Sequence, residues 1–168
     1  MPYKLATIVE NIQSIHNSIN AGLISEFHQY MIENDSSERH QNNNLKAIIY
    51  FARFLGPAVS FLDIYKKEQV LLFLDTKIRP AEQDPEKKWI NSWNDYARRI
   101  KRFFRWLHNT RERTQPIIEQ TDWITPEFVN IKKKRTKRIS PYSETELLER
   151  DEILSIIKYE PFKRTRLH

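Results

Sequence analysis

Three groups of polar residues in this 168-residue chain have side chains suited to binding a polyanion. The first is the basic segment, residues 131–138, which reads IKKKRTKR and has six basic residues out of eight. Clustered cations neutralise phosphates and release counterions, the main sequence-independent driving force for nucleic-acid binding. A solvated tether or a localisation signal would have the same composition. The candidate DNA-binding residues here are Lys132, Lys133, Lys134 and Arg135.

The second group lies on one face of a helix predicted over residues 84–109. Amide and guanidinium groups read the edges of adenine and guanine in a major groove, and they also bind phosphates. A basic stripe that simply faces solvent would look the same. The candidates on this face are Asn91, Asn94, Arg98 and Arg102.

The third group is the sequence SERHQNNNLK at residues 37–46, at the start of another predicted helix. The backbone N–H groups at a helix start favour an anion. Asparagine has poor helix propensity, so three in succession need a reason beyond folding. Contact with DNA is one such reason, and drift on a surface helix is the alternative. The candidates are Arg39, His40, Asn42, Asn43 and Lys46.

Residues for catalysis or metal binding are not evident. The chain has no cysteine, and its five histidines do not form an H-E-x-x-H pair or another close ligand spacing. Two glycines cannot build a phosphate loop or a dinucleotide-binding turn. Tyr142 and Tyr159 have no neighbouring Arg/His cluster to activate them. We therefore predict no catalytic residue, no metal and no cofactor.

The charge of the chain is uneven. Residues 1–90 carry 10 basic and 11 acidic side chains, whereas residues 91–168 carry 18 and 11, so the second part has a net charge of +7. This asymmetry favours a polyanionic partner, with a merely solvated basic surface as the alternative. No apolar run reaches the length of a membrane span, and the absence of cysteine fits a reducing compartment. We expect a cytoplasmic, nucleoid-associated protein without membrane contact.

The elements that must position these residues are predicted to be helices, because apolar residues recur at helical spacing and no Asn-Gly or Asp-Gly turn occurs. The clearest is residues 84–109, whose apolar stripe steps by 4, 3, 4, 3 and 4 residues. That stripe is Trp89, Trp93, Tyr96, Ile100, Phe103 and Leu107. The other predicted helices are 23–33, a helix ending at residue 55, 66–75 and 145–159.

Local signals predict where several helices begin and end. Asp35 with Glu38 reads as a capping box before the second helix, and Gly56 followed by proline ends that helix. Asp84 is predicted to cap the fourth helix, with Pro85 at its first position. The predicted organisation is an N-terminal arm or short helix (1–20), a helical domain (21–110), a linker (111–142) and one further helix (143–168).

Four stretches occur in an order that resembles a known family. They are LKAIIYFARFL (45–55), KKEQVLLFL (66–74), WINSWNDYARRIKRFFRWL (89–107) and PEFVNIKKKRTKRISPYSETELL (126–148). Their succession resembles the N-terminal, core-binding (SAM-like) domain of tyrosine recombinases, the phage-integrase family, and is most similar to archaeal integrases. The resemblance covers residues 23–166.

The resemblance implies an all-α bundle that clamps one face of a DNA duplex. The start of the second helix and the outward face of the fourth would lie against DNA, which by position selects His40, Asn42, Asn43 and Lys46, and Asn91, Asn94 and Arg98. The cations from Lys132 to Arg135 would cross the backbone between two domains.

The resemblance also implies that the catalytic residues of the family belong to a further domain that this chain lacks. Residues 143–168 resemble the first helix of that domain. We therefore expect a double-stranded DNA-binding part of an integrase-like recombinase, involved in DNA integration and recombination, without activity of its own. The alternatives are one half of a split recombinase completed by a catalytic chain or other protomers, and a helical protein-interaction module.

Overall fold

The computed structural model describes residues 5–111 and 119–135, which form five α-helices and three 3-10 helices without a strand. The predicted all-α fold class is therefore confirmed. The α-helices are α1 (Leu5–Glu10), α2 (Ser18–Glu33), α3 (Glu38–Leu55), α4 (Lys67–Asp75) and α5 (Trp89–Thr110). The 3-10 helices are η1 (Phe61–Asp63), η2 (Gln120–Asp122) and η3 (Glu127–Val129). The helix predicted over 145–159 lies outside the described residues.

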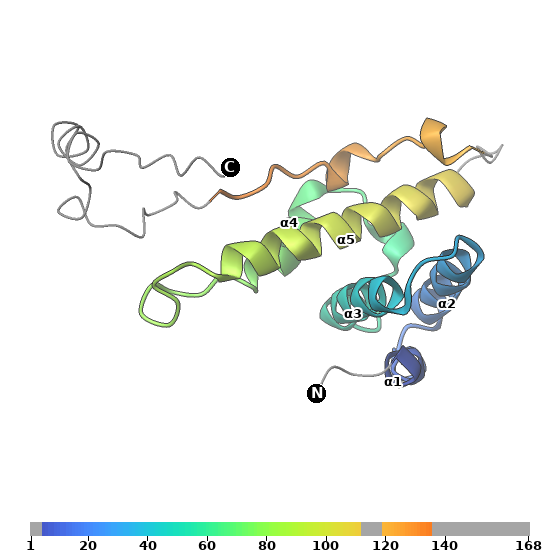
Figure 1. The fold of residues 1–168 in the computed structure, drawn as a ribbon, viewed down its shortest axis with the longest axis horizontal. Helices are drawn as coiled ribbons and strands as arrows, with labels where there is room; N and C mark the ends of the chain where they lie inside the picture. Colours follow the sequence, from blue (N-terminus) through green and yellow to red (C-terminus); the bar gives the residue numbers. More distant parts are fainter. Residues whose placement is uncertain (1–4, 112–118, 136–168) are drawn as a thin grey trace, which may run out of the picture. The chain divides into compact units, whose positions relative to one another are not determined.

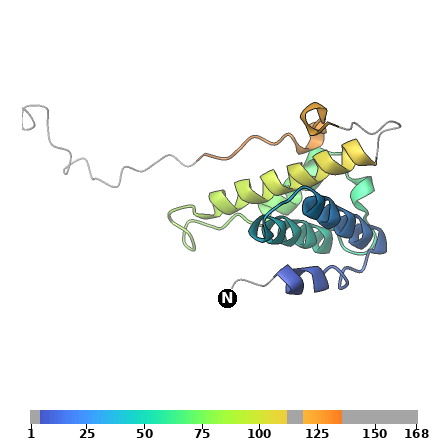
Figure 2. The same cartoon turned by 45° about the vertical axis from the view of Figure 1, so that its right-hand side comes forward.

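Helix α5 is the central element. Its apolar stripe faces the core as predicted: Trp93, Ile100, Phe103 and Leu107 are buried, and the rest of the stripe is partly buried. Figures 1 and 2 show α5 between the segment 120–135 on one side and helices α2 and α3 on the other. A helix with neighbours on both sides keeps a narrow strip of its surface for solvent, and this strip carries its polar residues.

Aromatic side chains fill the centre of this bundle. The ring of Phe103 lies 5.2 Å from that of Phe27 on α2 and 4.8 Å from that of Phe61 on η1, measured between centroids. Both pairs meet edge to face, the geometry that the quadrupoles of aromatic rings favour. The core therefore ties α2, η1 and α5 together. Among the described residues, no helix has the length and apolar composition to cross a bilayer.

The N-terminal segment is part of this core rather than a detached arm. Helix α1 packs on α3, and Ile8, Ile12 and Ile15 are buried in the main hydrophobic cluster. A guanidinium N–H of Arg53 on α3 donates to the Asn11 side chain at 3.1 Å, which adds a polar tie. The stability of the bundle thus includes residues N-terminal to the predicted boundary at 21.

The predicted starts of two helices are wrong in opposite directions: α3 begins later than the predicted cap implies, and α2 begins earlier than predicted. Asp35 is not the cap of α3: it has a φ of 50° inside the α2–α3 turn, and Ser37 is the N-cap residue. Helix α2 begins at Ser18, five residues earlier than predicted, because the side chain of Asn17 caps it by accepting from the N–H of Asn20.

Helix α5 begins at Trp89, not at Pro85, which lies in a preceding turn with Lys87 at a φ of 53°. Asp84 nevertheless caps the helix from a distance, because its carboxylate accepts from the N–H of Trp89 at 2.8 Å. The predicted end of α3 is confirmed: Gly56 has a φ of 75° and donates its N–H to the carbonyl of Ala52.

Residues 120–135 were predicted as linker, yet they pack along α5. Val129 is buried in the main cluster, and Trp123, Phe128 and Ile131 pack against it. The buried Asn109 fixes the segment, because its amide donates to the Ile124 carbonyl at 2.7 Å and its oxygen accepts from the Ile124 N–H at 3.0 Å. Residues 111–126 are mostly polar, so the sequence predicts a linker and does not show that these few apolar residues pack against the core.

Candidate nucleic-acid interface

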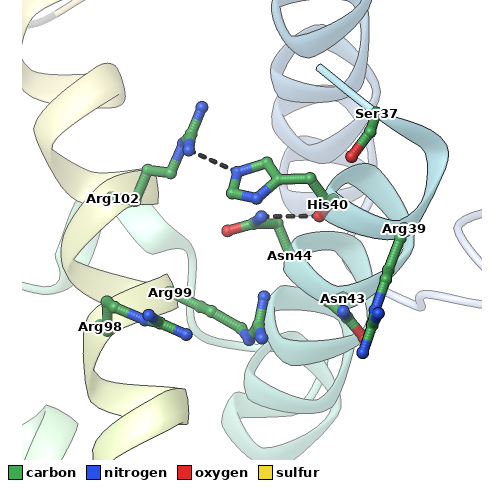
Figure 3. Close-up of a pocket in the computed structure, with 8 residues that line it drawn as sticks. All are labelled: Ser37, Arg39, His40, Asn43, Asn44, Arg98, Arg99 and Arg102. Carbon is green, nitrogen blue, oxygen red and sulfur yellow. Dashed lines mark hydrogen bonds between the residues drawn. The ribbon is translucent and has the colours of Figure 1, made fainter. Parts of the chain in front are cut away.

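The start of α3 and the middle of α5 meet at an open groove of about 470 Å³, which we call the arginine groove (Figure 3). No acidic residue belongs to its lining. The lining residues are Ser37, Arg39, His40, Asn43, Asn44, Arg98, Arg99 and Arg102.

Helical periodicity explains why these side chains face the groove. On α3 the residues Gln41 and Leu45 are buried, so Arg39 and Asn43, each two positions before one of them, lie on the opposite side of the helix and face outward. On α5 the buried Ile100 and Phe103 alternate with the arginines in the same manner. The inward stripes thus place the two polar faces on one side of the α3–α5 contact.

The turn before α3 is held rigidly by side chains. The amide of Gln41 donates to the carbonyl of Ser36 at 2.7 Å, and its oxygen lies 3.0 Å from Nε2 of His28 on α2. Asn44 is buried, with its amide donating to the carbonyl of His40 at 2.7 Å. These bonds fix the start of α3, which is one wall of the groove, relative to α2.

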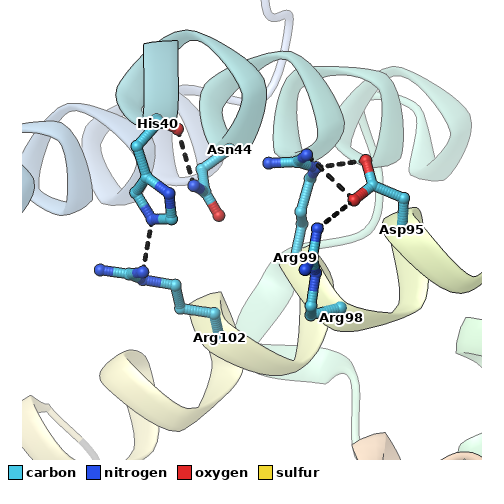
Figure 4. Close-up of polar contacts among 6 residues, drawn as sticks. All are labelled: His40, Asn44, Asp95, Arg98, Arg99 and Arg102. Carbon is cyan, nitrogen blue, oxygen red and sulfur yellow. Dashed lines mark hydrogen bonds and ion pairs between the residues drawn. The ribbon is translucent and has the colours of Figure 1, made fainter. Parts of the chain in front are cut away.

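His40 and Arg102 join the two walls of the groove. The guanidinium of Arg102 contacts Nε2 of His40, as Figure 4 shows. Burial lowers the pKa of His40 below its ordinary value, and the positive charges of Arg102, Arg99 and Arg98 lower it further. His40 is therefore neutral near neutral pH and can accept a hydrogen bond from Arg102.

Asp95 orients the other two arginines of α5. Its carboxylate accepts from Arg99 at 2.7 and 3.0 Å and from Arg98 at 2.5 Å (Figure 4). Burial alone would raise the pKa of Asp95, but the hydrogen bonds and charges of these arginines lower it overall. One carboxylate thus faces two guanidinium groups, which leaves an excess of positive charge.

The charge of the groove decides what it can bind. Four arginines line it and a single neighbouring carboxylate, that of Asp95, pairs with two of them. Arginine cannot lose its proton in proteins, and its planar fork matches phosphate oxygens. The arrangement therefore suits an anion with phosphate groups.

The structure brings together five of the residues predicted from sequence. These residues are Arg39, His40, Asn43, Arg98 and Arg102, which come from two segments about 60 residues apart and line one groove. Sequence patterns placed them on two helix faces, and the packing of α3 on α5 makes those faces neighbours.

Other predicted residues lie elsewhere. Asn91 is exposed near the start of α5, outside the groove lining, and Asn42 is partly buried without lining it. Lys46 lines a different, smaller pocket with Tyr50, and its ammonium lies 5.9 Å from the centroid of that ring.

Two predicted DNA-binding residues make contacts that hold the fold together. The side chain of Asn94 accepts from the backbone N–H of Lys134 at 2.9 Å and donates to its carbonyl at 2.8 Å. The ammonium of Lys134 lies 4.8 Å from the ring centroid of Trp93 and 5.0 Å from that of Trp89, and 3.7 Å from a carboxylate oxygen of Asp75. Asn94 and Lys134 together fasten the end of segment 120–135 to α4 and α5.

The remaining cations of the described basic segment face solvent. Lys132, Lys133 and Arg135 are exposed. Because Lys134 is fixed, its neighbours Lys133 and Arg135 are held at a defined place along α5 rather than on a free tether.

Sequence reasoning missed three lining residues, Ser37, Asn44 and Arg99. Arg99 adjoins Arg98 and lies three residues before Arg102, so helical spacing could have found it. Ser37 and Asn44 carry no such signal, because the tertiary contact between α3 and α5 alone makes them part of a groove.

Within the described ranges, no group of three or more His, Cys, Asp or Glu side chains lies close enough to hold a metal ion. Comparison of the chain with models of protein families, with curated proteins and with solved structures gave no match.

Proposed function

We propose that this chain binds double-stranded DNA through the arginine groove and the neighbouring face of α5. The observation that carries the proposal is the convergence of four arginines from α3 and α5 on one groove without an acidic lining residue. Phosphates of a nucleic-acid backbone are the ligands that such a surface neutralises best.

The extent of the basic surface supports a long ligand rather than a single anion. Lys101 and Arg105 continue the positive face of α5 beyond the groove, and Lys133 and Arg135 are exposed on the segment beside it. A helix of 22 residues is about 33 Å long, close to one turn of B-form DNA. Several phosphates can therefore contact this surface at once.

The resemblance to tyrosine recombinases supports a more specific role. Of the seven helix residues that it selects, three line the groove, namely His40, Asn43 and Arg98, and the other four lie outside its lining. We propose that the chain acts as a DNA-holding, core-binding part in integration or recombination. In this proposal it works at the nucleoid, and the chemistry on DNA belongs to a separate catalytic domain or chain.

Fluorescence anisotropy with labelled duplexes tests the proposal. The wild-type chain and the variants Arg98→Ala and Arg102→Ala are titrated onto a random-sequence duplex at several salt concentrations. Each variant should weaken binding about 5–20-fold and lower the slope of log K against log salt by about one, because each removes one phosphate contact.

Arg79→Ala is the matched control, since Arg79 is exposed in the loop between α4 and α5 and is not part of the groove lining. It should leave both affinity and salt slope near the wild-type values. If all three variants lost the same affinity for DNA, the effect would come from net charge and not from the groove. If the groove variants kept the wild-type affinity, the proposal would be refuted. In that case a protein-interaction module would become the better hypothesis.

A further inference from the structure

A second pocket, which we call the aromatic pocket, adjoins the arginine groove. It is an open hollow of about 400 Å³ between α2, α5 and residues 120–125. Arg98 and Arg102 line both hollows, so the two are continuous along α5. The segment 120–125 that closes the pocket runs beside α5 in Figures 1 and 2.

Three aromatic rings form one side of this pocket. Trp106 is buried, with an exposed fraction of 4%, whereas Tyr30 and Trp123 are partly buried. The Tyr30 and Trp123 centroids lie 5.6 Å apart with their planes tilted by 33°, and Tyr30 lies 6.1 Å from Trp106. Stacking on such rings is how proteins bind bases regardless of sequence.

The aromatic side is fixed by hydrogen bonds. Nη2 of Arg105 donates to the carbonyls of Trp123 and Gln120, at 3.0 and 3.1 Å, and its Nε donates to Trp123 at 3.3 Å. Burial raises the pKa of the Tyr30 hydroxyl, with the charges of Arg102 and Arg105 opposing it, so the hydroxyl stays neutral and able to donate. The pocket is therefore preformed, with aromatic and cationic groups close together.

We propose that the aromatic pocket binds one unpaired nucleotide of the DNA that occupies the arginine groove. The base stacks on Tyr30 and Trp123, and its phosphate is held by Arg98 and Arg102. This inference rests on the proposed function, because the shared arginines connect the nucleotide to a strand in the groove. A paired base cannot enter, since its faces are covered by its neighbours in the duplex.

The experiment uses 2-aminopurine, a fluorescent base that is quenched when it stacks. Three labelled duplexes share one sequence: a fully paired duplex, a duplex with a single unpaired 2-aminopurine, and a duplex with an unpaired abasic sugar at that position. The unpaired base should bind about tenfold more tightly than the other two and lose fluorescence on binding. Because the abasic duplex is equally easy to bend, it separates base binding from flexibility of the DNA.

Variants connect the effect to the pocket. Trp123→Ala should abolish the preference for the unpaired base while affinity for the paired duplex changes less than threefold, and Trp123→Phe should keep most of the preference. Tyr65→Ala, which removes an exposed aromatic ring outside the pocket, is the control and should change neither quantity. Circular dichroism of each variant verifies that its helices are intact, and Tyr30→Leu is the substitute if Trp123→Ala does not fold.

Two results would overturn the inference. One is equal affinity for the abasic and the base-containing duplexes, and the other is binding of free 2-aminopurine deoxynucleotide as tight as that of the unpaired base in DNA. If no duplex binds, the proposed function itself has failed. If the paired duplex binds and the unpaired base gives no advantage, the failure belongs to the aromatic pocket alone.

Discussion

Arg102 on α5 donates a hydrogen bond to Nε2 of His40 on α3, across 62 positions of sequence. The bond needs a neutral imidazole, and burial together with three nearby arginines lowers the pKa of His40 to keep it neutral. His40, which the sequence predicts as a DNA-binding residue, thus also connects the two helices that form the arginine groove.

The hydrogen bond between His40 and Arg102 should make the stability of the fold depend on pH. The pKa of His40 is lowered from 6.5, so the unfolded chain binds a proton there more readily than the folded one. The stabilising effect of the neutral imidazole is complete above about pH 6.5 and is lost as the pH falls toward the lowered pKa of the folded state. Urea unfolding from pH 7.5 to pH 5 should therefore show stability decreasing with acidification.

His40→Gln should flatten that profile, because glutamine accepts from Arg102 without titrating. His16→Gln is the matched control, because His16 is exposed. This variant should show the same change of stability with pH as the wild type. A His40→Gln profile as steep as that of the wild type would disprove a role for His40 in it.

The exposed cations of segment 131–135 should contribute equally to the affinity for DNA duplexes of any sequence. Lys133→Glu combined with Arg135→Glu should weaken binding to a selected and a scrambled duplex by the same factor, about 10–100-fold at 100 mM salt, because phosphate contacts carry no sequence information. Anisotropy across a salt series measures it. The control is Lys66→Glu combined with Lys67→Glu, at the start of α4, which changes the net charge by the same amount. It should weaken binding to both duplexes much less.

Asn91 should instead contribute to discrimination. Its amide is exposed near the start of α5, where it can reach a base edge, and a good bidentate contact is worth about 1–3 kcal/mol against the wrong base. Asn91→Ala should reduce the affinity ratio between a duplex enriched from a random pool and its scrambled form by about tenfold. Ser92→Ala, the exposed neighbour, should keep the ratio, and an unchanged ratio in Asn91→Ala would argue against base contact.

Asn94 should matter for stability more than for DNA. Asn94→Ala removes both hydrogen bonds to the backbone of Lys134, and we expect a loss of about 1–2 kcal/mol in the free energy of unfolding. Urea denaturation followed by tryptophan fluorescence measures the loss, since Trp89 and Trp93 lie beside Lys134. The solvent-facing Asn91→Ala should stay within about 0.5 kcal/mol of the wild type. Equal stabilities of the two variants would contradict the assignment of Asn94 as an anchor.

Phe103 should be among the most costly residues to truncate. It is fully buried between Phe27 and Phe61, so Phe103→Ala should destabilise the fold by about 3–5 kcal/mol through lost burial and the cavity left behind. Thermal unfolding compares it with Tyr65→Ala, whose ring is 67% exposed and whose loss should be within about 0.5 kcal/mol. A small effect in Phe103→Ala would mean that the core can close around the gap.

Much of the helical pattern could be read from the sequence. The stripe from Trp89 to Leu107 predicted both the existence of α5 and its buried face, because helical periodicity links sequence spacing directly to one side of a cylinder. Gly56 marked the end of α3 for an equally local reason, since its positive φ suits a residue without a Cβ. Starts of helices were less predictable: Asp84 caps α5 across a turn, which no fixed spacing to the helix reveals.

The sequence by itself predicted the existence of α2, α3, α4 and α5, the basic character of residues 91–168 and the polar faces that form the arginine groove. Only the tertiary structure decided that Arg39 and Arg102 line one hollow, that Lys134 is an anchor, and that Trp123 joins Tyr30 beside α5. The physical reason is that helix formation depends on neighbours within a few residues, whereas a groove depends on how distant faces pack. A charged or aromatic side chain has the same local signal whether it meets solvent, another helix or a ligand.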